Sequence, residues 1–320
     1  MTSRIDFWEL RRRNARKTVF LIFLYLVIIG VLGWLVDFYL LQLSFPWATV
    51  ISLAYGSLQV ILTMGIGGPM VARSLGARPA DPSDPLEKRF INVVEEMAIA
   101  AGIPTPKAYV LDEEAPNAFA SGWKPEKSVV CATRGLLEMM NREELMGVVG
   151  HEVAHIRNGD TRIMTTVAGL ATALVLLGTI AYYVMRFMGY AARDSKRDRR
   201  GGGGMVILLA YLVGLLIYFL SRLLARLLAM AVSRSREYMA DAGSVEFTRN
   251  PLGLASALEK IASWKGGFTH KGVDAYSHLF ISEPKPSKLS EGESWFSNLF
   301  STHPPIRKRI EILKKMAGAA

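Results

Sequence analysis

Two histidines and a glutamate within five consecutive residues are the strongest chemical signal in this 320-residue sequence. The stretch His151-Glu152-Val153-Ala154-His155 places the two imidazoles four residues apart. In a helix such residues share one face, with Cβ atoms about 6 Å apart, so both side chains can reach one Zn²⁺ ion. The glutamate between them would face a water on that ion. The spacing therefore predicts a zinc centre with a carboxylate placed to act as a base.

A third ligand must come from another part of the chain. Glu237 and Asp241 are four residues apart and would share one face of a helix. Two histidines and a glutamate with an open fourth position are typical of a catalytic zinc site, because structural sites are closed. Asp241 could then accept the second ring N–H of a ligating histidine and fix its tautomer. On spacing alone, a solvated or arginine-paired carboxylate is an equally good interpretation of Glu237.

The composition favours a membrane protein with a substantial soluble part. Apolar residues make up 51% of the chain, and its net charge is +10. The basic residues lie beside apolar runs, as at the cytoplasmic ends of membrane spans, and no nucleic-acid-binding module is recognisable. A nucleic-acid partner is therefore not expected. The single cysteine, Cys131, excludes an intrachain disulfide and is expected to be a buried thiol in a reducing compartment.

Four uncharged apolar runs indicate where the candidate zinc site lies relative to a membrane. Thr18–Val36 and Leu43–Ala72 are each long enough to cross a hydrocarbon core of about 30 Å. The first run is too long for a signal peptide and no small-residue cleavage site follows it, so we expect an anchor. Basic residues flank both ends of this hairpin, which places those ends in the cytoplasm.

The second pair of runs leaves the topology open. Ile163–Met185 and Gly201–Ser221 enclose a basic loop, Arg186–Arg200, which would lie outside, against the positive-inside rule, if both runs crossed the membrane. Alternatively, one or both runs only dip into the bilayer. In either arrangement an even number of crossings returns the chain to the side of His151.

The soluble stretches carry recognisable helix and strand signals. Helical spacing of apolar residues from Leu86 to Met97, ended by Gly102, predicts a helix. Lys107–Asp112 and Ser128–Thr133 are predicted strands, and a capping box at Asn141 is expected to start the helix of His151. An amphipathic segment at Leu252–Ile261 and a basic terminal helix at Ile306–Met316 are also expected.

These motifs together resemble the HtpX-type membrane zinc metalloproteases, relatives of the CAAX prenyl proteases. The resemblance rests on Pro116–Gly122, on His151–His155 with Asn158-Gly159-Asp160, on the block containing Glu237 and Asp241, and on Thr302-His303-Pro304-Pro305. It implies a mainly α, multi-pass membrane protein with a cytoplasmic zincin-type (gluzincin-like) α+β metalloprotease domain in the cell membrane. It also implies one Zn²⁺ per chain, with Glu237 as the third ligand after His151 and His155.

The apolar runs, read together with this resemblance, divide the chain into four segments. These are an N-terminal transmembrane hairpin (1–77), a first protease part with the His-Glu-x-x-His helix (78–162), a second hydrophobic hairpin (163–221), and a second protease part with the third ligand and the C-terminal helix (222–320).

Individual roles follow from the same resemblance. Glu152 is the expected general base and His303 a candidate donor to the oxyanion, although a structural role before the last helix is the alternative for His303. Asn117 is a candidate backbone contact for an extended peptide added to a strand edge, and an Asx turn is the alternative. His270 and His278 lack ligand spacing and are expected to be structural or at the surface.

The expected function is zinc-dependent hydrolysis of peptide bonds in membrane proteins, in quality control of misfolded or damaged substrates beside the lipid bilayer. A prenyl-peptide processing protease is one alternative. A non-catalytic zinc-binding scaffold is another, but it would not need Glu152. The sequence does not indicate the oligomeric state or the cleavage specificity.

Overall fold

A computed structural model describes residues 7–41, 44–171, 235–269, 279–282 and 304–318, together with residues 179, 183 and 219. The predicted basic loop at 186–200, most of the third apolar run beyond residue 171 and most of the fourth lie outside the described residues. The same is true of His270, His278 and His303.

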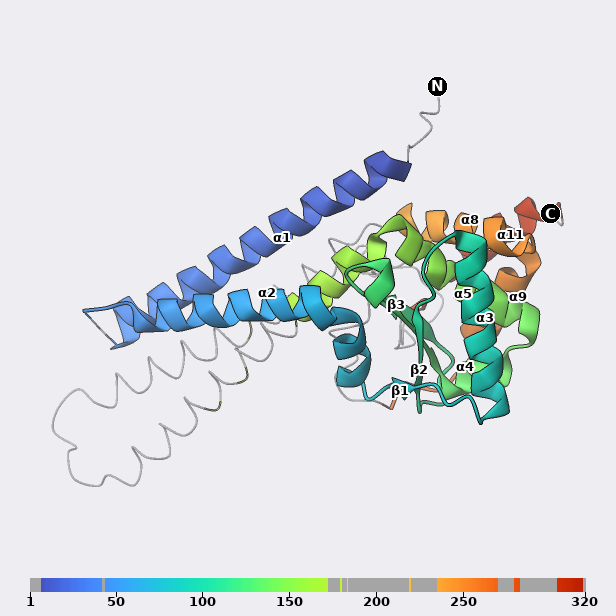
Figure 1. Cartoon of the computed structure of the whole chain (residues 1–320), viewed down its shortest axis with the longest axis horizontal. Coiled ribbons are helices and arrows are strands. Elements are labelled where there is room, and N and C mark those ends of the chain that lie inside the picture. The colour runs from blue at the N-terminus through green and yellow to red at the C-terminus, as the bar shows by residue number, and fades with distance from the viewer. Residues whose placement is uncertain are drawn as a thin grey trace.

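The chain begins with a long helical hairpin. Helix α1 (Phe7–Leu35) continues into a π-helical turn, η1 (Val36–Leu41), and α2 (Trp47–Ser74) returns beside it. Asp37 accepts hydrogen bonds from the backbone N–H groups of Ala48 and Thr49, both at 2.8 Å, and so caps the start of α2. The hairpin extends away from the rest of the fold (Figure 1).

Both helices of the hairpin have the length and composition that a membrane span requires. The qualifying segments are Ala15–Phe38 and Trp47–Ser74, with mean hydropathies of 2.9 and 1.6. Large apolar side chains such as Phe23 and Ile61 are each 64% exposed. The two predicted apolar helices are thus present, and their crossing of a bilayer stays a prediction.

A four-stranded mixed sheet forms the base of the part of the chain that follows the hairpin. Its strands are β1 (Arg78–Pro79), β2 (Lys107–Leu111), β3 (Ala118–Ser121) and β4 (Val129–Thr133), in the order β1-β2-β4-β3. The β2–β4 pair is parallel and the two outer pairs are antiparallel. The sequence signals identified β2 and β4 but not β3. All four residues of β3 are buried, so it shows no alternation of apolar and polar residues.

Helices gather beside this sheet (Figure 1). They are α3 (Pro85–Ala101), α4 (Arg134–Met139), α5 (Arg142–Asn158), α8 (Ser235–Thr248), α9 (Pro251–Ser263) and α11 (Ile306–Met316). The expected capping box is present, since the Asn141 side chain accepts from the N–H of Glu144 and the Glu144 side chain accepts from the N–H of Asn141. Gly159, with φ of 72°, ends α5, and residues 160–171 form a further helix.

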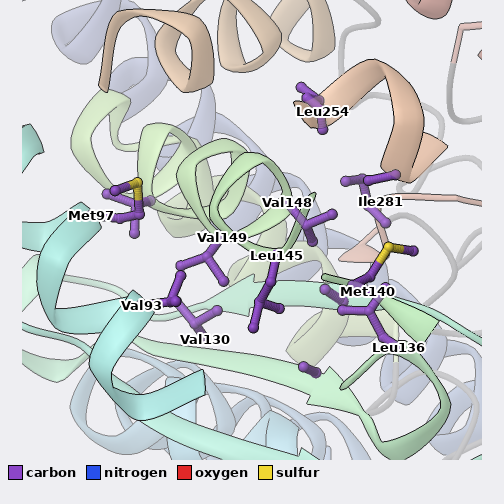
Figure 2. Packing of buried hydrophobic residues seen from close by; sticks show 14 of the residues in the cluster. Val93, Met97, Val130, Leu136, Met140, Leu145, Val148, Val149, Leu254 and Ile281 are labelled. Carbon is purple, nitrogen blue, oxygen red and sulfur yellow. The ribbon is translucent and has the colours of Figure 1, made fainter. Parts of the chain in front are cut away.

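Two buried apolar clusters hold these layers together. One joins α3, α5 and α9 to the sheet and includes Val130, Val148 and Leu254 (Figure 2). The close approach of α5 and α9 depends on Gly147, because a Cβ there would lie 2.6 Å from the backbone N of Leu254. The other cluster joins the base of the hairpin to the opposite face of the sheet, through residues such as Val71 and Phe119.

The hairpin is tied directly to the sheet and to the helix that follows α5. A Cβ on Gly68 of α2 would lie 2.7 Å from the carbonyl oxygen of Lys127, so only glycine allows this approach. Ser121 Oγ donates to the Gly68 carbonyl at 3.1 Å, and the N–H of Gly122 donates to Thr165 Oγ1 at 2.7 Å. The apolar hairpin is therefore connected through β3 to the helix that directly follows α5.

Candidate metal centre

Helix α5 brings the two predicted histidine ligands together. The Nε2 atoms of His151 and His155 lie 3.2 Å apart, and the rings are perpendicular with centroids separated by 4.7 Å. Both side chains are nearly inaccessible, with 1% and 3% exposure. The four-residue spacing thus points two nitrogen donors at one location.

Helix α8 supplies the third candidate ligand. The Glu237 carboxylate lies 3.6 Å from Nε2 of His151 and 3.5 Å from Nε2 of His155. One ligand atom from each of the three residues can be chosen so that all lie within 4.8 Å of one another. The set contains two imidazole nitrogens and one carboxylate oxygen, donors that suit Zn²⁺.

The far side of each imidazole faces a second carboxylate. Nδ1 of His151 lies 2.9 Å from Oδ1 of Asp241, and Nδ1 of His155 lies 3.2 Å from Oδ2 of Asp160. A carboxylate in this position holds the proton on Nδ1 and leaves Nε2 as a donor to a metal. The donor chemistry therefore fits a zinc ion held by His151, His155 and Glu237.

The carboxylates also govern the charge of the two histidines. Burial lowers the pKa of each imidazole, but hydrogen bonding to carboxylates outweighs it, so both pKa values are raised. The pKa of His155 is raised to about 10 through Asp160 and Glu237. The carboxylates thus favour positive charge at the two rings, whereas the guanidinium of Arg309 opposes it at His151.

Glu152 lies on the same helix and is 1% exposed. Burial raises the pKa of its carboxyl above the usual range, and the nearby Glu237 adds to this effect, whereas the two histidines oppose it. A carboxylate with a raised pKa is a better proton acceptor in neutral solution than an exposed one.

A buried arginine from the last helix completes the site. Arg309 of α11 is 1% exposed and donates to both carboxylate oxygens of Asp241, from Nε at 2.9 Å and from Nη2 at 2.7 Å. Its Nη1 lies 3.3 Å from Oε2 of Glu237. Burial raises the pKa of Asp241, but the guanidinium outweighs this, so the net pKa is lowered. Arg309 therefore connects the third candidate ligand with the partner of His151.

Sequence reasoning did not identify Arg309 or the role of Asp160. A signal for Arg309 exists, because Ile306, Ile310 and Leu313 mark the apolar face of the basic helix, and Arg309 falls on that same face. No comparable sequence signal marks the contact of Asp160 with His155, because that contact depends on the direction that the chain takes after Gly159.

Asn117 lies next to β3 and its side chain is buried. Its amide Nδ2 donates to the carbonyl oxygen of Ser282 at 2.9 Å, and its Oδ1 accepts from the N–H of Ala118 at 3.0 Å. In this structure the amide thus contacts the chain itself, and its contact with a substrate stays a prediction. Cys131 is buried in β4, and burial together with Glu152 raises the pKa of its thiol.

Comparisons with known proteins identify the family of this chain. The family described as "Peptidase family M48" matches residues 85–317. A "Protease HtpX homolog" of Streptococcus uberis is 41% identical over 304 residues, which cover 95% of this chain and 98% of that protein. A "Protease HtpX homolog" of Thermoanaerobacter pseudethanolicus is 39% identical over 98% of this chain and 99% of its own length. The crystal structure of S. mikatae Ste24p is similar with a TM-score of 0.47 and 16% identity, over 95% of this chain and 66% of that one.

Proposed function

This chain belongs to peptidase family M48 and is a metallopeptidase of the HtpX type, and from that premise we propose that it is a zinc-dependent endopeptidase acting on membrane proteins. The observation that carries the proposal is the convergence of His151, His155 and Glu237 beside the buried carboxylate of Glu152. The first three residues would hold the zinc ion, one per chain.

The chemistry divides between the metal and the side chains. When bound, a zinc ion supplies a Lewis acid that polarises a peptide carbonyl and acidifies a water. Glu152 takes the proton of the attacking water and passes it to the leaving amine. Asp241 and Asp160 keep the histidine nitrogens oriented, and Arg309 keeps Asp241 in place.

We assign two further contacts to the reaction. His303 would donate a hydrogen bond to the tetrahedral oxyanion. Support comes from its neighbour Pro304, which is buried, and from α11, which brings Arg309 into the site six residues further along. Asn117 would contact the backbone of a substrate strand at the edge of β3.

The substrate class and the location follow from the apolar hairpin. A catalytic domain attached to α2 through Gly68 would lie close to a bilayer and meet exposed segments of membrane proteins. We propose that the two ends of the hairpin and the catalytic domain face the cytoplasm, in a multi-pass protein of the cell membrane with the four segments given above. Removal of misfolded or damaged membrane proteins is the role that fits this placement.

The test compares the wild type with Glu152→Ala. Both proteins are purified in detergent with a chelator, transferred to chelator-free buffer and supplied with Zn²⁺. Zinc per chain and cleavage of a loosely folded membrane protein are then measured. We expect equal zinc in both proteins and cleavage only by the wild type. Equal cleavage by both proteins would refute the role of Glu152, and activity without any metal would refute the zinc mechanism.

A further inference from the structure

A short segment of the chain occupies the outer edge of the sheet. Phe280, in the segment Leu279–Ser282, forms an antiparallel bridge with Phe119 of β3. The N–H of Ile281 donates to the carbonyl oxygen of Ala118 at 2.9 Å. Since β4 pairs with the other side of β3, the free edge of β3 is taken by the protein itself.

The same segment is held by groups that belong to the metal centre. The carbonyl oxygen of Ile281 accepts from Nη1 of Arg309 at 2.9 Å, and this nitrogen lies 3.3 Å from Oε2 of Glu237. A single guanidinium nitrogen therefore separates a backbone carbonyl from the third candidate ligand. The next carbonyl, of Ser282, accepts from the Asn117 amide at 2.9 Å.

The side chains of the segment enter apolar surroundings. Phe280 packs edge-on against Phe119 and Phe268, with ring centroids 5.1 Å and 5.3 Å apart. Ile281 belongs to the cluster of Val148 and Leu254, the former on the helix of the histidines (Figure 2). Phe280 and Ile281 are almost fully buried, at 1% and 2% exposure.

An extended peptide added to a sheet edge would need these same contacts: strand hydrogen bonds, polar groups for its carbonyls and pockets for its side chains. We propose that Leu279–Ser282 is an internal occupant of the substrate position, and that a substrate enters as a strand only after displacing it. This inference rests on the proposed peptidase function and adds its regulation.

The proposal also defines the class of substrate that competes successfully. A displacing strand must fill the space of Phe280 and of Ile281 and offer a carbonyl to Nη1 of Arg309. Unfilled apolar space and the loss of that one hydrogen bond would both favour return of the internal segment. Extended stretches with a large apolar residue followed by an aliphatic one meet this requirement. Such stretches are buried in folded proteins and become accessible when membrane proteins unfold.

A reversible tether tests the displacement. Phe119 and Phe280 form a non-hydrogen-bonded pair, in which Cβ atoms lie about 4.5–5.5 Å apart, so a disulfide can form with a small adjustment. The variant is Phe119→Cys, Phe280→Cys and Cys131→Ala, because Cys131 is opposite Phe119 in β4. The control is Phe280→Cys with Cys131→Ala. Zinc content, disulfide formation by mass, and casein cleavage are measured with and without reductant.

We expect the oxidised double-cysteine protein to cleave at least ten times more slowly than its reduced form at equal zinc content, and the control to be insensitive to oxidant. Equal rates in the oxidised and reduced forms, with the disulfide complete, would overturn the proposal.

A second variant applies if the tethered protein does not fold. Ile281→Pro lacks the N–H that donates to Ala118, so the segment is held less tightly and turnover should rise several-fold. Unchanged or lower turnover at full zinc content would overturn the displacement. A wild type that cleaves no more than Glu152→Ala would instead refute the peptidase function, so the two failures are distinguishable.

Discussion

At the scale of single residues, replacing Arg309 with lysine tests whether the site needs the hydrogen-bond geometry of the guanidinium or only its positive charge. Lysine keeps the positive charge but cannot donate simultaneously to both oxygens of Asp241 and to the Ile281 carbonyl. We expect Arg309→Lys to lower zinc affinity or turnover about 10- to 100-fold, the usual effect of losing a partner of a ligand. Zinc titration and kcat/KM measure it.

A matched control is available on the same helix. Arg307→Lys changes an exposed arginine two residues away and should leave zinc affinity and kcat/KM unchanged. If Arg309→Lys behaved like this control, Arg309 would have no positioning role.

The candidate ligands could be predicted from the sequence because their information is local. A four-residue spacing on a helix aligns His151 with His155, and Glu237 with Asp241, whatever the rest of the fold does. The contacts of Asp160 and Arg309 could not be predicted in the same way. They depend on a glycine-ended helix and on the docking of α11 from the far end of the chain.

At the scale of elements, an ion-pair network connects β1, α3 and α4. Glu87 of α3 is 1% exposed in its side chain and accepts from Arg78 at 2.7 Å and 2.9 Å. Asp84, the N-cap of α3, accepts from Arg134 at 2.7 Å. Hydrogen bonding to these arginines lowers the pKa of both carboxyl groups, and for Glu87 it outweighs the opposing effect of burial.

The sign of the pH dependence follows from the direction of these shifts. Because both pKa values are lower in the folded protein, the unfolded state binds more protons in acid, and the stabilisation is lost as pH falls through the folded pKa values, below about 4. We expect the melting temperature to fall steeply there. Glu87→Gln should lower stability by about 2 kcal/mol at pH 7 and flatten the acid decrease. Thermal unfolding followed by circular dichroism measures both, and a variant with the wild-type acid slope would contradict the assignment.

Two elements that the sequence did not predict, strand β3 and the segment Leu279–Ser282, share one physical property. Both are short, and all of β3 together with Leu279, Phe280 and Ile281 is buried, so periodicity carries no information about them. Their pairing brings together residues more than 150 positions apart, which local signals cannot specify. Helices α3, α5 and α11 were predicted well because caps and apolar spacing mark them locally.

The contact between α2 and the sheet gives an element-scale test with an internal control. Gly68→Ala would place a Cβ 2.7 Å from the Lys127 carbonyl, a backbone atom that cannot move cheaply. We expect a loss of about 1–3 kcal/mol in stability and reduced turnover. Gly65→Ala, on the same helix, meets nothing within 4 Å and should be neutral or slightly stabilising. Equal melting temperatures for the two variants would show that this contact does not hold the hairpin to the domain.

At the scale of the whole molecule, the hairpin and the metal centre form one connected object. Ser121 bonds to α2, and the neighbouring Gly122 bonds to the helix that follows α5. The segment on the outer edge of β3 bonds to Arg309 of the candidate site. If α2 spans a bilayer as proposed, these contacts hold the strand edge at a fixed position relative to the membrane surface. The orientation of the hairpin therefore determines which side of the membrane the candidate metal centre would face.

The orientation can be tested in intact cells by labelling introduced cysteines, because the native cysteine is not expected to react with thiol reagents. Cys131 is buried, and its raised pKa leaves it unreactive at neutral pH. A membrane-impermeant maleimide should label Ser44→Cys, in the exposed turn of the hairpin, without permeabilisation. It should label Glu95→Cys, exposed on α3, only after the membrane is opened. Labelling of Glu95→Cys in intact cells would place the metal centre outside and reverse the proposed topology, and with it the access of the site to cytoplasmic segments of membrane proteins.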